Sequence, residues 1–505
     1  RTPRQLLCLG FVLVRFHKLS MYAISAAGNV LSAAFCILPV KKKGNNPMKE
    51  EHDLTTGSVS KKLIRFALPL LFANLLQSFY SIADMLAVGR FVGKTGLAAI
   101  SNASMISFII NSICIGVTMG GTVLAAQYKG ADDEQGQRET IGTLFSIAFI
   151  ASLLVTILGL LVYKPLFQVL NVPAGSMQDA CDYMKIICCG TVFVFGYNAV
   201  CSIMKGLGDS KSSLYFIAVA TVVNILLDII LVGPFGMGTK GAAYATIFSQ
   251  GISLTISLIH LKGKDFIFQF RLKNFAIKPD KLTAILRVGL PTAIQMAVVN
   301  ISYLLITGML NNFGVSVAAA SGIGLKVNTF AGMPCWAIGQ AVTAMVGQNI
   351  GAHYIDRVKK TTKIGLCLNL SITFALVIFV QIFAGRIIML FDPASPEMIE
   401  AGILYLRICC GINSLIYAAM YTFDSFAIGI GSANVAMINA LLDAAIVRLP
   451  VSWLLAFLVP IGFPGVYIGQ ALSPLLPFIV GWAYFKSTSW EKKKLILSTT
   501  VSPVS

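Results

Sequence analysis

Asp84 ends a polar stripe in an otherwise apolar segment near the start of the chain. Asn74, Gln77 and Ser81 precede it at spacings of three and four residues, which place all four side chains on one face of a helix. A charge at the centre of a bilayer costs about 2.5–3.5 kcal/mol on insertion scales, and lipid offers no polar partners. We therefore expect the stripe to face a cavity or the protein interior. The alternative is that Asp84 lies near the outer interface, solvated beside Arg90.

A second polar pair lies in the apolar segment Val222 to Val232. Asn224 and Asp228 are one helical turn apart on one face, and Thr246 follows in the next apolar segment, where small residues permit close helix packing. Together with Asp84 they offer two carboxylates, an amide oxygen and a hydroxyl, an all-oxygen set that a hard cation such as Na⁺ prefers. The same carboxylates could bind a proton instead. For Asn224 and Thr246 the alternative is hydrogen bonding between helices.

The composition shows which elements must position these side chains. Of 505 residues, 56% are hydrophobic and 12% are charged, against about 25% charged in soluble proteins. This excludes a disordered chain, a coiled coil and an ordinary soluble enzyme, and it predicts an all-α integral membrane protein. A membrane span needs about 20 apolar residues. We predict twelve spans, at 63–88, 97–126, 141–163, 181–204, 213–233, 241–261, 284–310, 315–346, 364–384, 402–428, 435–459 and 466–485.

The basic residues gather in alternate loops, although the net charge of +18 alone could suggest nucleic-acid binding. The loops of one side carry most of the lysines and arginines, including those before the first span, in the long middle loop and after the last span. The loops of the other side carry Arg90, Lys94, Lys164, Lys240 and Arg386. The positive-inside rule then places both termini in the cytoplasm of a multi-pass protein of the cell membrane. The basic loops serve topology and contact with anionic lipids, and we expect no nucleic-acid partner.

Two halves of the chain repeat one another at an offset of 221 to 224 residues. Five matches in the same order indicate a duplicated six-span unit, and an even number of spans gives the two halves parallel topology. The matches pair Arg65-Phe-Ala-Leu-Pro69 with Arg287-Val-Gly-Leu-Pro291, Gln127-Tyr-Lys-Gly-Ala131 with Gln348-Asn-Ile-Gly-Ala352, Tyr183-Met-Lys-Ile186 with Tyr405-Leu-Arg-Ile408, Gly206-Leu-Gly208 with Gly429-Ile-Gly431, and Gly241 with Gly465.

The repeat divides the chain into an N-terminal six-helix lobe at 48–265, a cytoplasmic linker at 266–283, and a C-terminal lobe with a basic tail at 284–505. Residues 1–47 fit this plan poorly, because they contain no acidic residue and place Lys41 to Lys43 directly after an apolar run. We interpret them as upstream sequence translated from an over-extended start. A genuine additional helix from Leu19 to Val40 is the alternative.

From Met48 to Lys494 the chain resembles the multidrug and toxic compound extrusion (MATE) transporters. The resemblance rests on the basic residues before the Leu-Pro-Leu of the first span, the acid of that span ahead of Val88-Gly89, the repeated Gln-x-x-Gly-Ala element, Asn224-x-x-x-Asp228, and Gly241-Ala-Ala-Tyr-Ala-Thr246. It implies two six-helix bundles facing a central cavity, and export of organic, often cationic, compounds by antiport with Na⁺ or H⁺.

The resemblance also places the family's N-lobe cation site on Asp84, Asn224, Asp228 and Thr246, with Tyr183 as a nearby partner. The C-terminal half does not copy this set, because Ile306 stands at the position paired with Asp84. We therefore expect coupling in the N-terminal lobe, as in the DinF-type branch. The acids and the arginine left in the second half are Asp424, Asp443 and Arg448. Asp443 and Arg448 could form a structural ion pair, although a spacing of five residues fits an α-helix loosely.

Polar side chains of the first, seventh and eighth spans outline a substrate cavity only roughly. The candidates are Gln77, Gln295, Asn300, Tyr303, Lys326 and Gln340. Lys326 complicates a purely anionic cavity, and it could snorkel or pair with a carboxylate.

A flippase for lipid-linked saccharides, from the same wider superfamily, is the main alternative. Such a protein should present several cavity-facing cations for phosphate, and few basic residues lie within the spans. An enzyme is disfavoured because no paired-histidine, HExxH or Ser-His-Asp motif occurs, and a channel would lack repeated pore elements. We expect no cofactor beyond the coupling ion, a small amphipathic organic substrate, a monomer, and a bacterial source.

Overall fold

The computed structural model describes residues 52–169, 172–262, 266–390, 395–411, 413–459 and 461–491, and every regular element in them is helical. The predicted N-terminal segment 1–47 lies outside the described residues. In a bilayer each backbone polar group must find its partner within the protein, and a helix satisfies this for any apolar sequence. The apolar segments of this chain therefore fold as long helices.

The described residues of the first half form seven helices. They are α3 (Val59–Phe91), α4 (Lys94–Gly130), α5 (Glu134–Val169), α6 (Ala174–Cys189), α7 (Thr191–Gly206), α8 (Ser210–Val232) and α9 (Gly238–Lys262). The start of α8 shows how local sequence sets a boundary. The carboxylate of Asp209 caps it by accepting a hydrogen bond from the Ser212 amide at 2.9 Å, which satisfies one of the free amides of the first turn.

The second half follows the short 3₁₀ helix η1 (Leu272–Phe275) of the predicted linker. Its α-helices are α10 (Pro279–Asn311), α11 (Val315–Gly351), α12 (Ile355–Met389), α13 (Pro396–Cys409), α14 (Asn413–Gly429), α15 (Ala433–Leu441), α16 (Leu449–Trp453), α17 (Phe463–Leu472) and α18 (Leu475–Lys486). Two π-helical turns, η2 (Leu442–Arg448) and η3 (Leu454–Leu458), adjoin α16. They widen the helical spacing locally, which matters for the side chains described below.

All twelve predicted spans fall on helical segments. Within the described ranges, nine helices are long and apolar enough to cross a membrane, and two bent pairs raise the number to eleven. The pairs are α6 with α7, bent by 51°, and α13 with α14, bent by 46°, which are the equivalent fourth and tenth spans. The remaining predicted span is α11, which carries the polar side chains Lys326 and Gln340 and packs against seven other helices. The predicted all-α membrane fold is confirmed.

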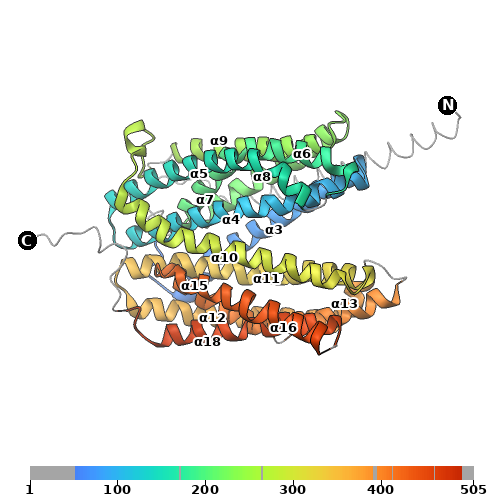
Figure 1. Cartoon of the computed structure of the whole chain (residues 1–505). Coiled ribbons are helices and arrows are strands. Elements are labelled where there is room, and N and C mark those ends of the chain that lie inside the picture. Colours follow the sequence, from blue (N-terminus) through green and yellow to red (C-terminus); the bar gives the residue numbers. More distant parts are fainter. Residues whose placement is uncertain are drawn as a thin grey trace, which may run out of the picture.

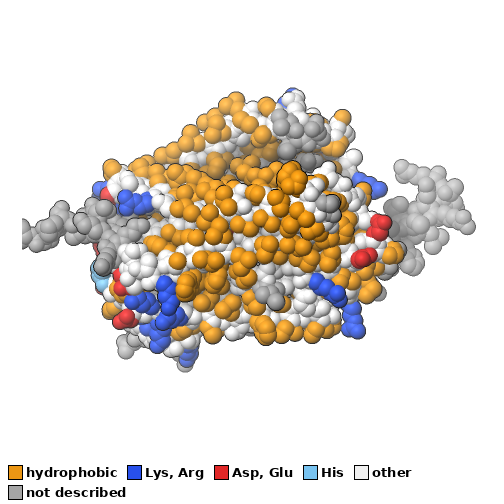
Figure 2. All heavy atoms as spheres, turned by 60° about the horizontal axis from the view of Figure 1, so that its bottom comes forward, with side chains coloured by type: hydrophobic (Ala, Val, Ile, Leu, Met, Phe, Trp, Pro, Cys, Tyr) orange, Lys and Arg blue, Asp and Glu red, His pale blue; other side chains and the backbone are white. Residues whose placement is uncertain are grey.

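A broad apolar band covers the face of the molecule shown in Figure 2, and most basic side chains in view lie at one end of it. We refer to the end at which α3 and α10 begin as the basic end, because the loops rich in lysine and arginine lie there. Two groups of helices run along this axis, with α3–α9 on one side and α11–α18 on the other, and α10 lies between them (Figure 1).

The helices α3 and α10 each pass from one group to the other. At the basic end, Leu63 of α3 packs in a buried cluster with Met345 of α11 and Phe426 of α14, whereas the far part of α3 lies along α8. Conversely, Ile285 of α10 packs in the core of the first half, and Ile306 packs in the core of the second. The first helix of each half therefore begins against the opposite half, a feature that the predicted lobe boundaries did not anticipate.

Candidate cation site

The far part of α3 brings Asp84 against α8, where Asn224 and Asp228 lie one turn apart. All three side chains are buried, with exposures of 7% for Asp84, 0% for Asn224 and 1% for Asp228. The two carboxylates are close enough to interact electrostatically. The structure thus unites acids that are 144 positions apart in the sequence, and Asp84 lies in the protein interior rather than at a solvated interface.

These buried groups lack protein partners for most of their polar atoms. Oδ1 of Asp84, both carboxylate oxygens of Asp228 and both amide atoms of Asn224 make no hydrogen bond. Buried polar groups are nearly always hydrogen-bonded, so unpartnered oxygens at one place need an explanation. A bound cation or a proton would satisfy them, and the donor set fits either one.

Two tyrosines and a threonine complete the surroundings of the carboxylates. The Tyr80 hydroxyl donates to Oγ1 of Thr246 on α9 at 2.9 Å. Tyr183 of α6 is 7% exposed and interacts with Asp84, Asp228 and Thr246. The structure therefore places Thr246 and Tyr183 beside the acids, an arrangement that the family resemblance implied, and it adds Tyr80. The signal for Tyr80 was present, since it lies four residues before Asp84 on the same face of α3.

The candidate site differs from a transition-metal centre. Among the described residues, no group of three or more histidines, cysteines, aspartates or glutamates gathers in a way that could hold such a metal. Two carboxylates with neutral oxygens form an all-oxygen donor set, which suits a hard cation such as Na⁺.

The second half has a charged pair at the place where α10 meets the π-helical turn η2. Arg448 forms an ion pair with Asp443, with 2.6 Å between Nη2 and Oδ2, and both side chains are 5% exposed. Nη1 of Arg448 donates to Oγ of Ser302 at 2.9 Å, and the guanidinium lies 4.4 Å from the centre of the Tyr303 ring. A π-helix has more residues per turn than an α-helix, so side chains five apart share a face. The loose spacing noted in the sequence is therefore the correct one for this turn.

Asp424 lies near this pair but has its own partner. Its Oδ1 accepts a hydrogen bond from the Asn439 amide at 2.6 Å, and it interacts electrostatically with Asp443. The two halves therefore differ in how their buried acids are neutralised. In the second half the guanidinium of Arg448 pairs with Asp443, whereas in the first half carboxylate oxygens of Asp84 and Asp228 have no protein partner. Because Arg448 already neutralises Asp443, this carboxylate needs no mobile ion.

The predicted cavity residues take different positions. Gln77, Asn300 and Lys326 are exposed, and Gln295 is buried with an unpartnered Oε1. The other two are engaged, because Tyr303 lies under Arg448 and Gln340 accepts a hydrogen bond from Lys205 of the opposite half at 3.1 Å. Asn300 also reaches the other half, donating to Oγ of Ser112 on α4 at 3.4 Å.

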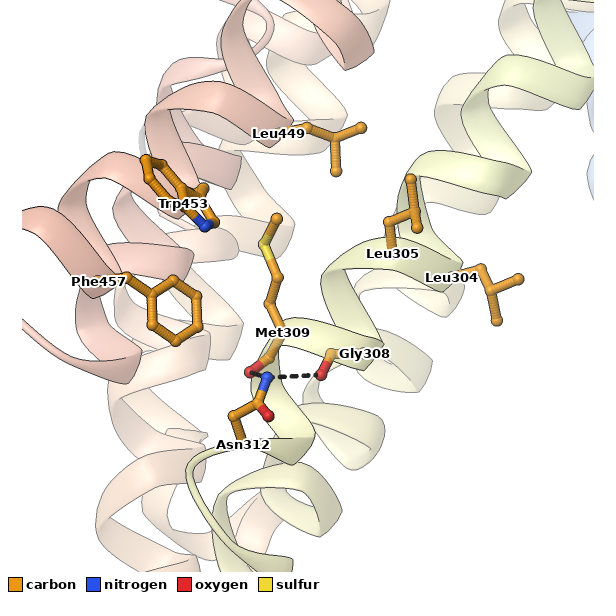
Figure 3. Close-up of a pocket in the computed structure, with 8 residues that line it drawn as sticks. All are labelled: Leu304, Leu305, Gly308, Met309, Asn312, Leu449, Trp453 and Phe457. Atoms are coloured by element: carbon orange, nitrogen blue, oxygen red, sulfur yellow. Dashed lines mark hydrogen bonds between the residues drawn. The ribbon is translucent and has the colours of Figure 1, made fainter. Parts of the chain in front are cut away.

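A separate groove lies between α10 and the helix that contains α16 and η3 (Figure 3). Its lining is almost entirely apolar, and its one amide, that of Asn312, already donates to the Gly308 and Met309 carbonyls of its own helix. The lining residues are Leu304, Leu305, Gly308, Met309, Asn312, Leu449, Trp453 and Phe457. The groove lies in the second half, away from the acids of α3 and α8, and contains none of the predicted site residues.

The MatE family model matches residues 69–230 and 291–454, one stretch in each half of the chain. The chain belongs to the MATE family. It is therefore a multi-pass membrane transporter and not an enzyme, and the double match agrees with the repeat seen in the sequence.

Three curated relatives of this MATE transporter are bacterial proteins. The "Probable multidrug resistance protein YoeA" of Bacillus subtilis is 28% identical over 460 residues, covering 87% of this chain and 96% of the relative. The "Probable multidrug resistance protein NorM" of Thermotoga maritima is 28% identical over 448 residues, covering 87% and 94%. The "FAD transporter" of Shewanella oneidensis is 26% identical over 375 residues, covering 72% and 82%.

Solved MATE structures share the fold. A transporter of the MOP superfamily from Pyrococcus furiosus superposes with a TM-score of 0.83 at 22% identity, covering 88% of this chain and 99% of that one. A multidrug resistance MATE transporter described as outward-facing also reaches 0.83, with the same identity and coverage.

Proposed function

We propose that this MATE transporter exports organic, often cationic, compounds in exchange for Na⁺ or H⁺. In this proposal the lobes 48–265 and 284–505 move relative to one another, so that the central cavity opens alternately to the two sides of the membrane. Both termini are cytoplasmic, and the protein acts as a monomer in the bacterial cell membrane. The coupling ion binds at Asp84, Asn224, Asp228 and Thr246, with Tyr183 beside them, as in the DinF-type branch. The names of the bacterial relatives support export of drug-like compounds.

One observation carries the proposal. Two interacting carboxylates lie buried in the first half with oxygens that no protein group satisfies. Keeping such groups ionised and empty in a low-dielectric interior is costly, so they favour a state in which a cation or proton is present. Antiport follows when ion and substrate each stabilise a different state of the protein, because each ligand shifts the equilibrium by its difference in affinity.

The contacts between the halves support an opening at the end opposite the basic end. The halves are joined at the basic end by buried side chains of α3, α11 and α14. Further along α10, beyond the contact of Asn300 with Ser112, the side chain of Thr307 is exposed. With the basic end in the cytoplasm, this form would receive ions from outside and release substrate there.

A flippase for lipid-linked saccharides is less well supported. Recognition of phosphate needs free cations, yet Arg448 is paired with Asp443, and Lys205 is bonded to Gln340. Lys326 is exposed and is one cation that an anionic compound could meet. The relative named as an FAD transporter makes an organic anion a useful second substrate class to test.

The proposal is tested with purified protein in sealed liposomes loaded either with ethidium, a fluorescent organic cation, or with FAD, a fluorescent organic anion. A Na⁺ gradient at equal pH and a pH gradient without Na⁺ are imposed separately, and dye movement is followed. Movement driven by one gradient supports the antiport and identifies the ion. Movement of FAD but not ethidium would overturn the cationic substrate class, and insensitivity to both gradients would overturn the antiport.

The hydroxyl of Thr246 offers a graded test of the ion site. Thr246→Val keeps the shape but removes the oxygen that accepts from Tyr80. We expect the half-saturating concentration of the coupling ion to rise about tenfold, the usual effect of leaving one buried polar group unpaired. Thr246→Ser keeps the hydroxyl and should stay near the parent value. Equal behaviour of the valine and serine variants would remove Thr246 from the site.

A further inference from the structure

The repeated Gln-x-x-Gly-Ala element ends α4 at 127–131 and α11 at 348–352, away from the ion site. The two helices meet at the glycines of these elements. A Cβ on Gly130 would lie 1.8 Å from the Gln348 carbonyl oxygen, and one on Gly351 would lie 2.0 Å from that of Gln127. The contact is therefore reciprocal, and each glycine is required because no side chain fits between the backbones.

The glutamine side chains also exchange contacts between the halves. Nε2 of Gln127 donates to the carbonyl of Gly429 at 3.2 Å, and Nε2 of Gln348 donates to the carbonyl of Gly206 at 3.0 Å. Both glutamines are fully buried. Gly206 ends α7 and Gly429 ends α14, which are equivalent positions of the repeat. Each half therefore closes the end of a helix in the other half, in the same way twice.

The segment 52–57 breaks this symmetry. The Leu54 amide donates to Oε1 of Gln348 at 2.9 Å, and Nδ2 of Asn349 donates to the Leu54 carbonyl at 3.3 Å. On the first half, Nδ1 of His52 lies 3.2 Å from the Gly208 carbonyl. The segment thus bridges the two halves, and Leu54 is 2% exposed. The equivalent Oε1 of Gln127 is buried without a partner.

Two charged groups hold the segment in this conformation. Arg357 of α12 donates to the carbonyls of Thr56 at 2.6 Å and of Gly57 at 2.8 Å. Asp53 accepts hydrogen bonds from Thr55 and Thr56. Partial burial alone would raise the pKa of Asp53, but these bonds and the nearby Lys62 outweigh it and hold the pKa below its usual value. Asp53 is therefore ionised at neutral pH and fixes the turn.

We propose that the two Gln-x-x-Gly-Ala elements form a clasp that closes the basic end of the transporter, and that segment 52–57 locks its Gln348 side. The role of the clasp in transport rests on the proposed alternation of the lobes, because the end must open for substrate to enter from the cytoplasm. Opening breaks both glutamine bonds and both glycine contacts at once. The elements therefore act as one two-state device, and the lock makes the Gln348 side the harder one to release.

The test reads opening directly, with Ala126→Cys as the reporter. Ala126 is fully buried and faces Gly347 across the interface. Its modification by a water-soluble maleimide is measured by peptide mass spectrometry, which separates it from the native cysteines. Gln348→Met should speed the modification about tenfold or more, the usual effect of leaving buried polar partners unsatisfied. Gly351→Ala should speed it as well, because its added Cβ would lie 2.0 Å from the Gln127 carbonyl oxygen and force the helices apart. Gln127→Met should have a smaller effect, because Gln127 makes one such bond where Gln348 makes two.

Gly322→Ala is the matched control, because it lies in the same helix as Gly351 and its added Cβ would meet no atom within 4 Å. It should leave the rate unchanged. If every clasp variant is folded and its reporter cysteine is modified no faster than in the protein without a clasp substitution, the proposed clasp is wrong. This measurement needs no transport, so it decides the clasp even if the chain moves none of the tested compounds.

A second arm keeps the test valid if a clasp variant fails to fold. Ala126→Cys with Gly347→Cys should form a disulfide under oxidation. An added Cβ at Gly347 would lie 2.9 Å from that of Ala126, so the two helices need to separate only slightly to reach the roughly 3.5–4.5 Å between the Cβ atoms of a disulfide. The cross-linked protein should lose transport and regain it on reduction. Full transport by the oxidised protein would overturn the clasp, whereas absence of transport in the reduced parent would count against the proposed function instead.

Discussion

Asp84→Asn and Asp228→Asn should each lower gradient-driven export by about 100-fold, at the upper end of ordinary coupling between two ligands. Asparagine preserves the shape and one oxygen but removes the charge that attracts the ion. Because the two carboxylates share one buried site, removal of either one leaves ligands whose negative charge is too small to bind the ion tightly. The measurement is dye efflux from liposomes under the gradient that drives the parent protein.

Asp182→Asn is the matched control for these two variants. Asp182 lies in the same half and pairs with Lys240 at 3.1 Å, where both side chains are accessible to solvent. Such exposed pairs contribute little, about 0–1 kcal/mol, so this variant should transport as the parent does. Export that survives both Asp84→Asn and Asp228→Asn would remove the ion site from the first half and direct attention to Asp424 and Asp443.

Binding of the ion gives an independent measurement of the same site. In the parent protein, Na⁺ or a lower pH should slow thermal unfolding, because a ligand that binds only the folded state stabilises it. The effect should disappear in Asp228→Asn, because this change removes a carboxylate whose two oxygens have no protein partner. Stabilisation that persists in this variant would show that the ion binds elsewhere.

The sequence predicted the fold class because membrane folding is governed by patterns that are local in the chain. Long apolar segments and basic loops mark the spans without knowledge of any contact. The repeat could be found in the same way, and the family assignment confirms the transporter prediction. The count of spans depends on α11, which carries polar residues inside a crowded bundle and is not among the described helices that are apolar enough to cross a membrane.

Part of the candidate site could be predicted from the sequence for a similar reason. Asn224 and Asp228 share a helix face by spacing alone, whereas their approach to Asp84 depends on packing between α3 and α8. Tyr80 could have been found from its position one turn before Asp84. The crossing of α3 and α10 between the halves could not have been found in this way, because an apolar helix face does not specify which half it packs against. The role of these residues in coupling stays a prediction.

The Asp443–Arg448 pair shows a different limit of sequence reasoning. Its spacing of five residues fits an α-helix poorly, and no local sequence pattern predicted that residues Leu442–Arg448 form a π-helical turn. The turn places both side chains on one face, where the pair reaches Ser302 of α10. Buried polar groups of this kind depend on contacts that are distant in the sequence.

Arg448→Met should destabilise the protein by about 3–5 kcal/mol, the usual cost of removing one partner of a buried ion pair. The loss leaves Asp443 without its cation, and it leaves Asp424 and Asp443 to repel one another. It also removes the donor to Ser302. The expected result is a large drop in the denaturation midpoint in mixed micelles and little folded protein at the growth temperature.

The double variant Asp443→Leu with Arg448→Met decides what the pair is for. Replacing both members of a buried pair by apolar side chains is often neutral or stabilising, so the double variant should regain most of the stability lost in Arg448→Met. If it also transports, the pair serves only the structure of the second half, and the tethered guanidinium has made that half independent of a mobile ion. A stable double variant that binds the coupling ion normally but exports nothing would instead give the pair a part in transport. Failure to recover stability would contradict the ion-pair explanation itself, because the cost of Arg448→Met would then lie in the contacts with Ser302 and Tyr303.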